Sequence, residues 1–311
     1  MKVVLPALAR ALLEPRLPEG LDLVWVTTRE EATAEMADAD IGWVDLYPHG
    51  LTGEAVAAAR KLRWLFTAIA GIESLDLAAL RAMGTVVTNG AGINAIAVAE
   101  YAVMGVLVAA KRYDEVVRIA DRRAWPDYAP GRQELHETRA LIVGYGAIGR
   151  LIGARLAAFG VDVTGVTRSG RDGTLTPDTW KTKLGTFDWV ILAAPSTDDT
   201  RALIGKSDLV AMKSSAWLIN MARGDMVDQD ALIDALGRKQ IAGAFLDTVD
   251  PEPLPEDHPL WRTTNVILSM HLSGRSQTKM FVRAADLFLR NLTAFRAGTP
   301  MENVVDLAAG Y

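Results

Sequence analysis

One glycine-rich hexapeptide near the middle of the chain constrains the fold more than any other feature of the sequence. It follows the apolar run 140–143 directly and precedes a helical pattern that ends at Gly160. A strand, a tight glycine turn and a helix in this order direct backbone N–H groups and the positive end of a helix dipole toward a pyrophosphate. A strand-to-helix turn without a ligand is the alternative, and three glycines at this spacing favour the dinucleotide site. The predicted binding turn consists of Gly144, Tyr145, Gly146, Ala147, Ile148 and Gly149.

Length and composition narrow the class of protein. A chain of 311 residues is longer than one hydrophobic core usually supports, so two domains are expected. Half of the residues are apolar, but no run of about 18 apolar residues predicts a membrane span. The net charge is −5 and the 33 Lys and Arg residues are scattered, which argues against nucleic acid as a partner.

Two kinds of feature are missing from the sequence. The chain has no cysteine, and none of His49, His136 and His258 has a partner at ligand spacing, so neither a disulfide nor a metal site is predicted. The first residues carry one charge and then an apolar, strand-like run, which does not match an export signal. The expected compartment is therefore the cytoplasm.

Short apolar runs alternate with helical patterns on both sides of the glycine turn. The strand candidates before the turn are residues 3–5, 21–26, 41–46, 62–67 and 85–88, with helical patterns at 52–60 and 75–82. Those after it are residues 161–167, 187–194, 216–220, 241–247 and 265–270, with a helical pattern at 229–238. This alternation predicts doubly wound α/β domains, each with a parallel sheet.

Two long helical patterns join these parts. Residues 94–118 contain almost no helix breakers and predict one long helix between the domains. The last pattern, 277–297, is long enough to leave the second domain and pack on the first. We therefore expect a first domain of residues 1–98 and 276–311 and a dinucleotide-binding domain of residues 99–275.

The strand after the glycine helix ends without a carboxylate. An NAD-preferring site has Asp or Glu about 20 residues beyond the motif, where it accepts from the ribose 2′-hydroxyl. This chain has Thr167, Arg168 and Ser169 there. Because an arginine binds a phosphate through paired charged hydrogen bonds, NADP(H) is the preferred cofactor and NAD(H) the alternative. Arg168 is the main predicted phosphate ligand, with Thr167 and Ser169 assisting and Arg171 as a further candidate. Stacking of Arg168 on the adenine is the other interpretation.

Three further segments supply reactive side chains just beyond predicted strands. They contain Arg223, Glu252 and His271, and open parallel sheets bind ligands at the carboxyl ends of their strands. Each residue has a structural alternative when it is considered singly. Arg223 could cap a helix, Glu252 could be an exposed loop acid, and His271 could be a buried histidine bonded to the backbone.

Taken together, and in this order, the segments resemble the D-isomer-specific 2-hydroxyacid dehydrogenase family. The resemblance covers nearly the whole chain and is carried by residues 70–71, 94–100, 144–149, 220–225, 247–255, 271–274 and 298–304. It implies two Rossmann-like doubly wound domains, of which the first is flavodoxin-like, is completed by the C-terminal helix and binds the substrate. It also implies NAD(P)-dependent reduction of a 2-oxoacid to the D-2-hydroxyacid. Segment 167–169 is most similar to the NADPH-dependent glyoxylate and hydroxypyruvate reductase branch.

The resemblance also assigns roles to single residues. Arg223 would bind the carboxylate and carbonyl oxygens of the substrate, His271 would donate the proton to the carbonyl, and Glu252 would orient the histidine ring. The further substrate-binding residues that it implies are Ile69, Ala70 and Gly71. The further cofactor-binding residues that it implies are Val98, Ala194, Pro195, Thr200, Ala222, Asp247, Ser273 and Gly274. For Asp247, capping of the next turn is the alternative.

Two positions depart from the family pattern, and other functions stay open. Glu73 stands where an aspartate is common, and Trp217 where a smaller residue is common. The resemblance implies a homodimer with its contact within residues 101–131, and a small 2-oxoacid or 2-hydroxyacid as the substrate. The alternatives are an NAD-dependent D-lactate-type or phosphoglycerate-type dehydrogenase and a nucleotide-sensing interaction protein, because the family includes corepressors.

Overall fold

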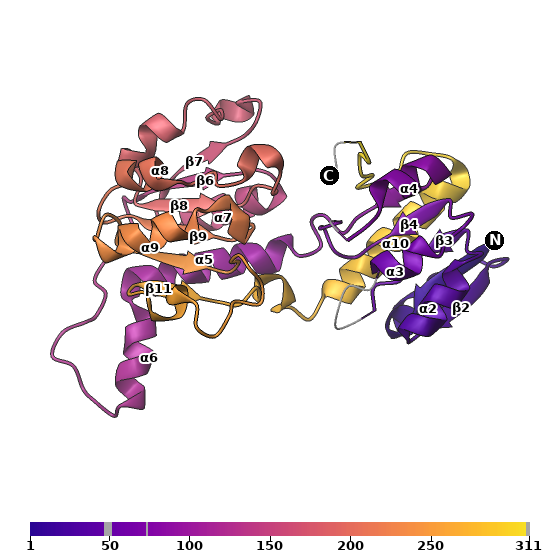
Figure 1. Ribbon diagram of the computed structural model, residues 1–311, viewed down its shortest axis with the longest axis horizontal. Helices are drawn as coiled ribbons and strands as arrows, with labels where there is room; N and C mark the ends of the chain where they lie inside the picture. The colour runs from indigo at the N-terminus through magenta and orange to yellow at the C-terminus, as the bar shows by residue number, and fades with distance from the viewer. Residues whose placement is uncertain (47–51, 73, 309–311) are drawn as a thin grey trace. The chain divides into compact units, whose positions relative to one another are not determined.

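The structure, a computed structural model, describes residues 1–46, 52–72 and 74–308, and the chain divides into two units (Figure 1). Unit 1 consists of Met1–Asn94 and Gln277–Tyr311, and unit 2 of Ala95–Ser276. The first boundary lies four residues before the expected one, because helix α5 (Ala95–Lys111) packs within unit 2 from its first residue. Among the described residues, no helix combines the length and the apolar character that crossing a membrane requires.

Unit 1 is built on a five-stranded parallel sheet in the order β2-β1-β3-β4-β5. Its strands are β1 (Lys2–Pro6), β2 (Asp22–Val26), β3 (Ile41–Gly42), β4 (Trp64–Phe66) and β5 (Val86–Thr88). This order is that of a flavodoxin-like sheet, as expected. The strand predicted over 41–46 is shorter than expected, since only its first two residues join the ladder.

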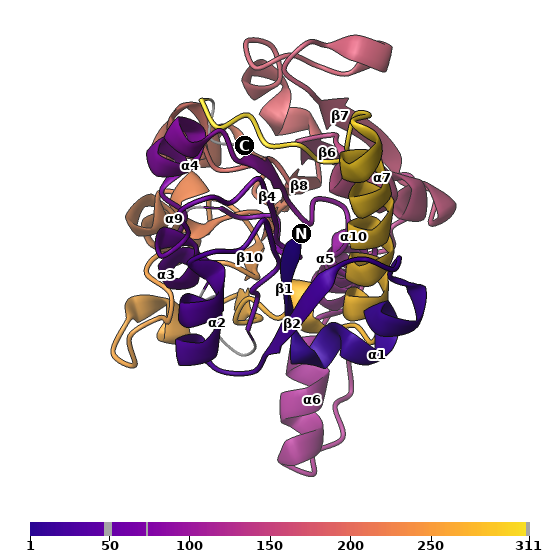
Figure 2. The same cartoon turned by 90° about the vertical axis from the view of Figure 1, so that its right-hand side faces the viewer.

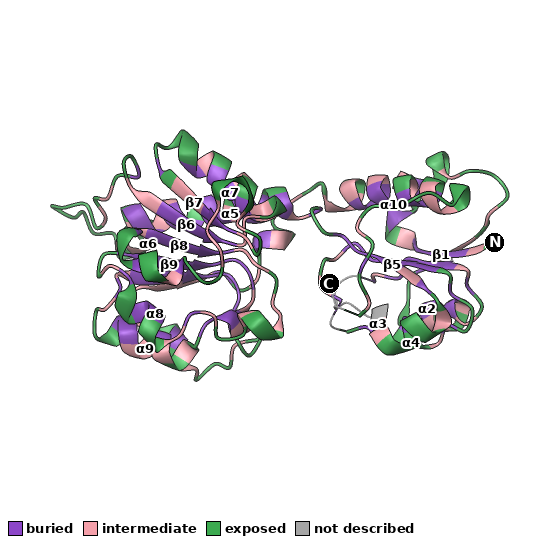
Figure 3. Cartoon of the chain, turned by 90° about the horizontal axis from the view of Figure 1, so that it is seen from above, coloured by how far each residue is buried: buried purple, intermediate pink, exposed green. Residues whose placement is uncertain are grey.

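Helices cover both faces of this sheet (Figure 3). One face packs against α2 (Arg29–Met36), α3 (Thr52–Ala57) and α4 (Leu77–Met83). The other face packs against α1 (Arg10–Leu13) and the C-terminal α10 (Met280–Ala297). Phe288 of α10 stacks on Trp64 of β4 with the ring centroids 5.0 Å apart. The last helix therefore covers one face of the sheet together with α1 and completes unit 1, as expected.

Unit 2 contains a six-stranded parallel sheet in the order β11-β10-β9-β8-β6-β7. Its strands are β6 (Arg139–Val143), β7 (Asp162–Val166), β8 (Trp189–Leu192), β9 (Trp217–Asn220), β10 (Gly243–Leu246) and β11 (Val266–Leu268). All six strands are parallel, but the order in which the chain adds them across the sheet reverses between β6 and β8. Parallel α/β sheets bind ligands at such a point, beyond the carboxyl ends of the strands.

Helices also cover both faces of the second sheet. Helices α5 and α7 (Ala147–Ala158) pack on one face, and α8 (Lys206–Ala211) and α9 (Gln229–Gly237) pack on the other. Successive residues of β6 alternate between the two apolar clusters, with Ile142 on the α5 face and Leu141 on the α8 face. This period of two follows from the strand geometry and buries both faces of the sheet.

The single helix predicted over 94–118 is wrong, because the structure has two helices there. Helix α5 ends at Lys111 and α6 (Tyr113–Asp121) follows, with Arg112 between them in the left-handed conformation at φ 47°. The Arg112 guanidinium donates to Asn265 Oδ1 at 3.0 Å and lies 5.8 Å from the ring centroid of Trp217. Trp217 fits because Gly243 faces it, where a Cβ would lie 2.4 Å from the ring. Contacts with distant strands therefore accompany the break, and no glycine or proline marks it.

Candidate active site

The three glycines of the predicted dinucleotide turn are favoured for three different geometric reasons. Gly144 has φ 96°, and a Cβ there would lie 2.4 Å from the backbone nitrogen of Ala194, in the loop after β8. A Cβ at Gly149 would lie 2.2 Å from the carbonyl oxygen of Gly144, so α7 packs closely on the turn. A Cβ at Gly146 would meet no atom of the described chain within 4 Å. The missing side chain at Gly146 therefore leaves open space at the N-terminus of α7, where a pyrophosphate would approach.

The side chain of Tyr145 packs inside unit 2. A Cβ at Gly165 would lie 2.4 Å from the tyrosine ring, and one at Gly153 would lie 2.6 Å from its hydroxyl. The ring therefore occupies a niche that two glycines leave open. The guanidinium of Arg150 lies 5.5 Å from the ring centroid and forms an ion pair with Asp172 at 2.9 Å. Because the side chain of Tyr145 is packed in this niche, the predicted contact of Tyr145 with a cofactor would be made by its backbone.

The segment after β7 forms a hydrogen-bonded turn. The Thr167 hydroxyl lies 2.6 Å from the Thr174 hydroxyl and accepts from the Gly170 N–H at 3.1 Å. Arg168 and Ser169 are exposed at this turn. The hydroxyl of Thr167 thus stabilises the turn that presents the predicted phosphate ligand to solvent.

The loop after β8 is also held by its own hydrogen bonds. The Thr200 hydroxyl donates to the Pro195 carbonyl at 2.9 Å and accepts from the Thr197 N–H at 2.7 Å. Two other predicted cofactor contacts, Val98 and Ala222, are buried, at 7% and 6% exposure. Val98 belongs to the apolar cluster between α5 and the sheet.

Glu252 and His271 form a direct contact, as predicted. The histidine Nδ1 lies 2.7 Å from Glu252 Oε2, and Glu252 Oε1 accepts from the Val249 N–H at 3.1 Å. Burial raises the pKa of the Glu252 carboxyl, but the hydrogen bond and charge of His271, the Val249 N–H and the charge of Arg223 together outweigh burial and lower the pKa. The carboxylate is therefore ionised at neutral pH and accepts a hydrogen bond from the Nδ1–H group, which leaves Nε2 for chemistry.

The loop after β9 carries Arg223 and lies against the loop after β10. Asn220, at 1% exposure, accepts from the Ala222 N–H at 3.0 Å and donates to the Arg223 carbonyl at 2.8 Å. A Cβ at Gly224 would lie 2.0 Å from the carbonyl carbon of Val249, so only glycine allows this approach. Because β9, β10 and β11 are neighbours, their loops bring arginine, glutamate and histidine to the same edge of the sheet.

Asp247 is buried directly after β10, at 1% exposure, and its carboxylate is bonded within the chain. It accepts from the Ser269 hydroxyl at 2.7 Å, from the Leu272 N–H at 3.1 Å and from the Ser273 N–H at 3.3 Å. The Ser273 hydroxyl donates to it as well. These bonds match the turn-capping alternative for Asp247. They also involve Ser273, and the contact of Ser273 with a cofactor remains a prediction. Gly274 follows in the short helix Ser273–Arg275.

In unit 1, the predicted substrate loop follows β4. The carbonyl oxygens of Ile69 and Ala70 accept from the Gly90 N–H and the Asn89 side chain, each at 2.9 Å. No acceptor for the N–H groups of Ala70 and Gly71 occurs within residues 1–46, 52–72 and 74–308. Two adjacent N–H donors suit a carboxylate. Glu73, the nearby departure from the family pattern, lies outside the described residues.

Two residues that hold this loop were missed in the sequence. Asp45 accepts from the Thr67 hydroxyl at 2.9 Å and from the Ala68 N–H, and Trp43 Nε1 donates to it at 3.0 Å. Asn89 is the second missed residue. Both follow strands of the first sheet closely, so the rule that functional groups lie beyond the carboxyl ends of strands was the available signal.

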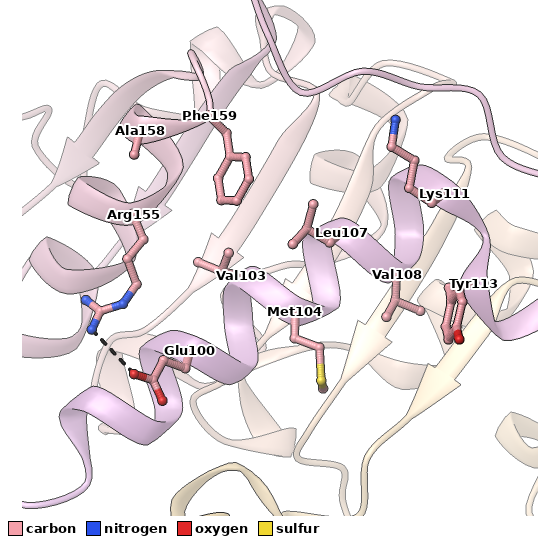
Figure 4. Close-up of a pocket in the computed structure, with 10 residues that line it drawn as sticks. All are labelled: Glu100, Val103, Met104, Leu107, Val108, Lys111, Tyr113, Arg155, Ala158 and Phe159. Carbon is pink, nitrogen blue, oxygen red and sulfur yellow. Dashed lines mark ion pairs between the residues drawn. The ribbon is translucent and has the colours of Figure 1, made fainter.

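An apolar pocket of about 560 Å³ lies between α5 and α7 of unit 2 (Figure 4). Met104 and Phe159 line it and are 39% and 45% exposed, and an ion pair of 3.8 Å joins Glu100 and Arg155 beside it. None of the reactive residues lines this pocket. It is therefore a surface feature separate from the candidate active site.

Helix α6 and the segment after it extend away from the second sheet (Figures 1 and 2). None of the nine residues of α6 is buried. Val117 is 45% exposed, and Trp125 and Tyr128 in the following segment are 97% and 81% exposed. Apolar side chains thus remain in contact with solvent along this arm, defined as residues 113–131.

Comparison with known proteins identifies the family. A family model described as "D-isomer specific 2-hydroxyacid dehydrogenase, NAD binding domain" matches residues 103–273. A glyoxylate reductase from Thermofilum pendens is 33% identical over 284 residues, which cover 88% of this chain and 83% of that protein. The human glyoxylate reductase/hydroxypyruvate reductase is 30% identical over 267 residues, which cover 81% of this chain and 79% of that protein.

Solved structures agree with the sequence matches. The crystal structure of a D-isomer specific 2-hydroxyacid dehydrogenase family protein from Aeromonas salmonicida is 27% identical and superposes with a TM-score of 0.88. It covers 98% of this chain and 99% of its own. The chain therefore belongs to the D-isomer specific 2-hydroxyacid dehydrogenase family, whose members are NAD(P)-dependent oxidoreductases, as the sequence resemblance predicted.

Proposed function

We propose that this protein reduces a small 2-oxoacid of the glyoxylate or hydroxypyruvate type to the D-2-hydroxyacid with NADPH. The contact of 2.7 Å between His271 and an ionised Glu252, beside the loop of Arg223, is the observation that carries the proposal. Proton donor, orienting anion and cation are the groups that carbonyl reduction requires of a protein. The names of the relatives from Thermofilum pendens and human also favour this substrate class.

The turn around Gly146 fits a nicotinamide dinucleotide. The open space at this glycine and the helix N-terminus behind it suit a pyrophosphate. The bound nicotinamide would supply the hydride. The remaining cofactor contacts that we propose come from Val98, Ala194, Pro195, Thr200, Ala222, Ser273 and Gly274.

The chain's own residues would bind the substrate and supply the proton. Arg223 would bind the carboxylate and the carbonyl oxygen through its planar guanidinium. His271 would donate its Nε2 proton to the carbonyl oxygen, while Glu252 holds Nδ1 and stabilises the ring orientation. The N–H groups of Ala70 and Gly71 would donate to the substrate carboxylate.

A panel of 2-oxoacids tests the substrate class. Glyoxylate, hydroxypyruvate, pyruvate, phenylpyruvate and phosphohydroxypyruvate are each incubated with NADPH and with NADH, and cofactor oxidation is followed. We expect the highest kcat/KM for glyoxylate or hydroxypyruvate with NADPH. A higher kcat/KM for pyruvate or phosphohydroxypyruvate with NADH would support the NAD-dependent alternative. If none of the five acids is reduced, the nucleotide-sensing alternative replaces the proposal.

We predict that Arg168→Asp raises the KM for NADPH about 10- to 100-fold and leaves the KM for NADH within about threefold. A charged hydrogen bond is worth roughly 1.5–3 kcal/mol, and the new carboxylate also repels the 2′-phosphate. Steady-state kinetics with both cofactors measure the change. Lys183→Asp is the control, because it alters the charge equally at an exposed position of the same unit. An unchanged ratio of the two KM values would contradict the phosphate role of Arg168.

We further propose that a second copy of the chain covers the pocket between α5 and α7 and the apolar side chains of the arm. Both surfaces lie within or next to residues 101–131, and both expose apolar groups to solvent. Large exposed apolar surfaces of this kind are typical of protein interfaces. The occupant is a second copy because the resemblance to the family implies a homodimer whose contact lies within residues 101–131, where these surfaces are found.

Met104→Glu is expected to convert such a dimer to a monomer, because a carboxylate buried in an apolar interface loses its hydration without gaining a partner. Sedimentation equilibrium at several concentrations measures the mass. The control is Val210→Glu, which places the same charge at a 58% exposed apolar residue of α8. A wild-type monomer, or a Met104→Glu protein that dimerises as tightly as the wild type, would exclude this interface.

A further inference from the structure

The N–H groups of the predicted substrate loop in unit 1 are used in order along the chain. The Ala68 N–H donates to the Asp45 carboxylate. The Ile69 N–H donates to the Thr67 hydroxyl at 3.3 Å. The next two N–H groups, at positions 70 and 71, have no acceptor among the described residues. The chain therefore uses the donors that precede this pair and leaves the pair itself to a ligand.

Asp45 is the acceptor that holds this arrangement. Its Oδ1 accepts from the Thr67 hydroxyl at 2.9 Å. Its Oδ2 accepts from the Ala68 N–H and from Trp43 Nε1, the latter at 3.0 Å. Thr67 is 1% exposed and Trp43 is fully buried, so water does not reach these donors. Because a buried donor without an acceptor is unfavourable, the three donors hold the start of the loop against the carboxylate.

The aromatic core of unit 1 fixes the indole that faces Asp45. The Trp43 ring packs edge-on against Phe66 of β4, with the centroids 4.8 Å apart. It also lies 5.6 Å from the ring of Phe288, which belongs to the C-terminal helix α10. Side chains in such close packing keep one position. Trp43 Nε1 is thus a fixed donor, and it determines where the carboxylate of Asp45 lies beyond the carboxyl end of β3.

We infer that Asp45 is a positioning residue for substrate binding. It holds the loop so that the N–H groups of Ala70 and Gly71 remain available to the carboxylate of a 2-oxoacid, and it acts through the loop without contacting the substrate. The inference rests on the proposed function, in which these two N–H groups bind the substrate. The negative charge of Asp45 would by itself repel the substrate carboxylate. Its contribution therefore comes from the hydrogen bonds that it accepts.

Asp45→Leu and Asp45→Asn separate these two effects. Both remove the charge at similar volume, but only asparagine keeps an oxygen that accepts from Trp43 Nε1 and the Ala68 N–H. We expect Asp45→Leu to raise the KM for the 2-oxoacid about 10- to 100-fold, because a displaced loop loses a charged hydrogen bond to the substrate. Its kcat and its Kd for NADPH should stay within about threefold, because the loop holds the substrate equally before and during the reaction. Asp45→Asn should keep the KM within about threefold of the wild type.

The rise in KM should be the same for different substrates. All 2-oxoacids share the carboxylate that the loop would bind, and they differ only at the group beyond the carbonyl. A positioning residue of this loop therefore changes the KM for glyoxylate and for hydroxypyruvate by the same factor. Steady-state kinetics with both acids at saturating NADPH measure the two factors.

Thr67→Val provides the second test, should Asp45→Leu fail to fold. Valine matches the shape of threonine but lacks the hydroxyl that joins Asp45 to the Ile69 N–H. We expect the KM to rise about 3- to 10-fold, since one buried hydrogen-bonding group is lost. Thr67→Ser keeps the hydroxyl and should have a lower KM than Thr67→Val.

Asp40→Leu is the matched control for Asp45→Leu. Asp40 is also half-buried and lies directly before β3, at the opposite end of the same strand. Its carboxylate accepts from the Lys2 N–H at 2.8 Å. The control loses a carboxylate and its hydrogen bond in the same unit, but at the end of the strand away from the loop. Its KM and kcat should equal those of the wild type.

The amide ¹⁵N signals of Ala70 and Gly71 provide a readout independent of turnover. Oxamate carries the carboxylate of a 2-oxoacid, and its carbonyl belongs to an amide that the enzyme would not reduce. Titration of the NADPH complex with oxamate should shift both signals in the wild type and in Asp45→Asn. In Asp45→Leu the same shifts should require about 10-fold more oxamate or more.

The outcomes decide the inference. A raised KM in Asp45→Leu, shared by both acids and absent from Asp45→Asn, supports it. A wild-type KM in Asp45→Leu, an equal rise in both variants, or a rise confined to one acid would overturn it. If the wild type reduces no 2-oxoacid, the proposed function fails, whereas the oxamate titration still tests the role of Asp45. Wild-type signals of Ala70 and Gly71 that do not respond to oxamate would also overturn the inference.

Discussion

Replacing His271 with glutamine is expected to lower kcat for 2-oxoacid reduction about 10²- to 10⁴-fold, with NADPH binding within about threefold of the wild type. A positioned general acid contributes a factor of this size, and glutamine has no group that transfers a proton at neutral pH. Glutamine approximates the size of the ring and can still donate to Glu252, so the loss reports the proton transfer. Steady-state kinetics at saturating NADPH and fluorescence titration of the cofactor measure the two effects.

His136→Gln is the matched control for this variant, since the His136 side chain is 71% exposed and lies outside the three reactive loops. Its kcat should equal that of the wild type. A His271→Gln protein that keeps more than a tenth of the wild-type kcat would contradict the assignment of His271 as the acid.

The pKa of Glu252 determines the pH range over which the hydrogen bond between Glu252 and His271 is stable. Burial alone would raise the pKa of this carboxyl, but the contacts with His271 and the Val249 N–H and the charge of Arg223 together lower it in the folded protein. A lowered carboxyl pKa contributes stability above the pKa of the unfolded chain, and that contribution is lost as the pH falls through the folded pKa. The Glu252–His271 contact therefore persists at neutral pH, where the activity of His271→Gln is to be compared.

Arg223→Lys is expected to lower kcat/KM for the 2-oxoacid about 10²- to 10³-fold. Lysine keeps the positive charge but lacks the planar guanidinium that pairs with two oxygens at once. Loss of one donor to a developing negative charge costs a factor of this size in other enzymes. The change should affect both kcat and KM, because the guanidinium would contact both the carboxylate and the reacting carbonyl oxygen.

The control for this variant is Arg201→Lys. Arg201 lies 3.8 Å from Asp225, in the neighbourhood of the same loop, and its side chain is 67% exposed. The control should retain the wild-type kcat/KM, and the Kd for NADPH should be unchanged in both variants. Retention of wild-type kcat and KM by Arg223→Lys would remove Arg223 from the mechanism.

Much of the fold follows from local patterns. Strands β6 to β11 lie within or close to the runs expected from apolar periodicity, and α9 begins at the predicted Gln229. The contact between Glu252 and His271 was implied by the resemblance to the family, and the structure has it. Patterns of this kind act over a few residues, so a single sequence contains them.

Other features could not be predicted, because they depend on distant residues. The end of α5 at Lys111 coincides with bonds from Arg112 to Asn265, 153 residues later. The support of the predicted substrate loop by Asp45 requires β3 and β4 to be neighbours in the sheet. Neither the helix pattern nor the spacing of these residues indicates such contacts.

By itself, the sequence determined the glycine turn and most strands of the two sheets, because periodicity and turn residues are local properties. Its resemblance to the family indicated the arginine, glutamate and histidine of the candidate active site. Only the tertiary structure decided what surrounds Asp247. Its carboxylate bonds Ser273, 26 residues away, once β10 and β11 pair. A buried carboxylate takes its role from the donors that folding brings to it, and those donors are set by the packing of the whole unit.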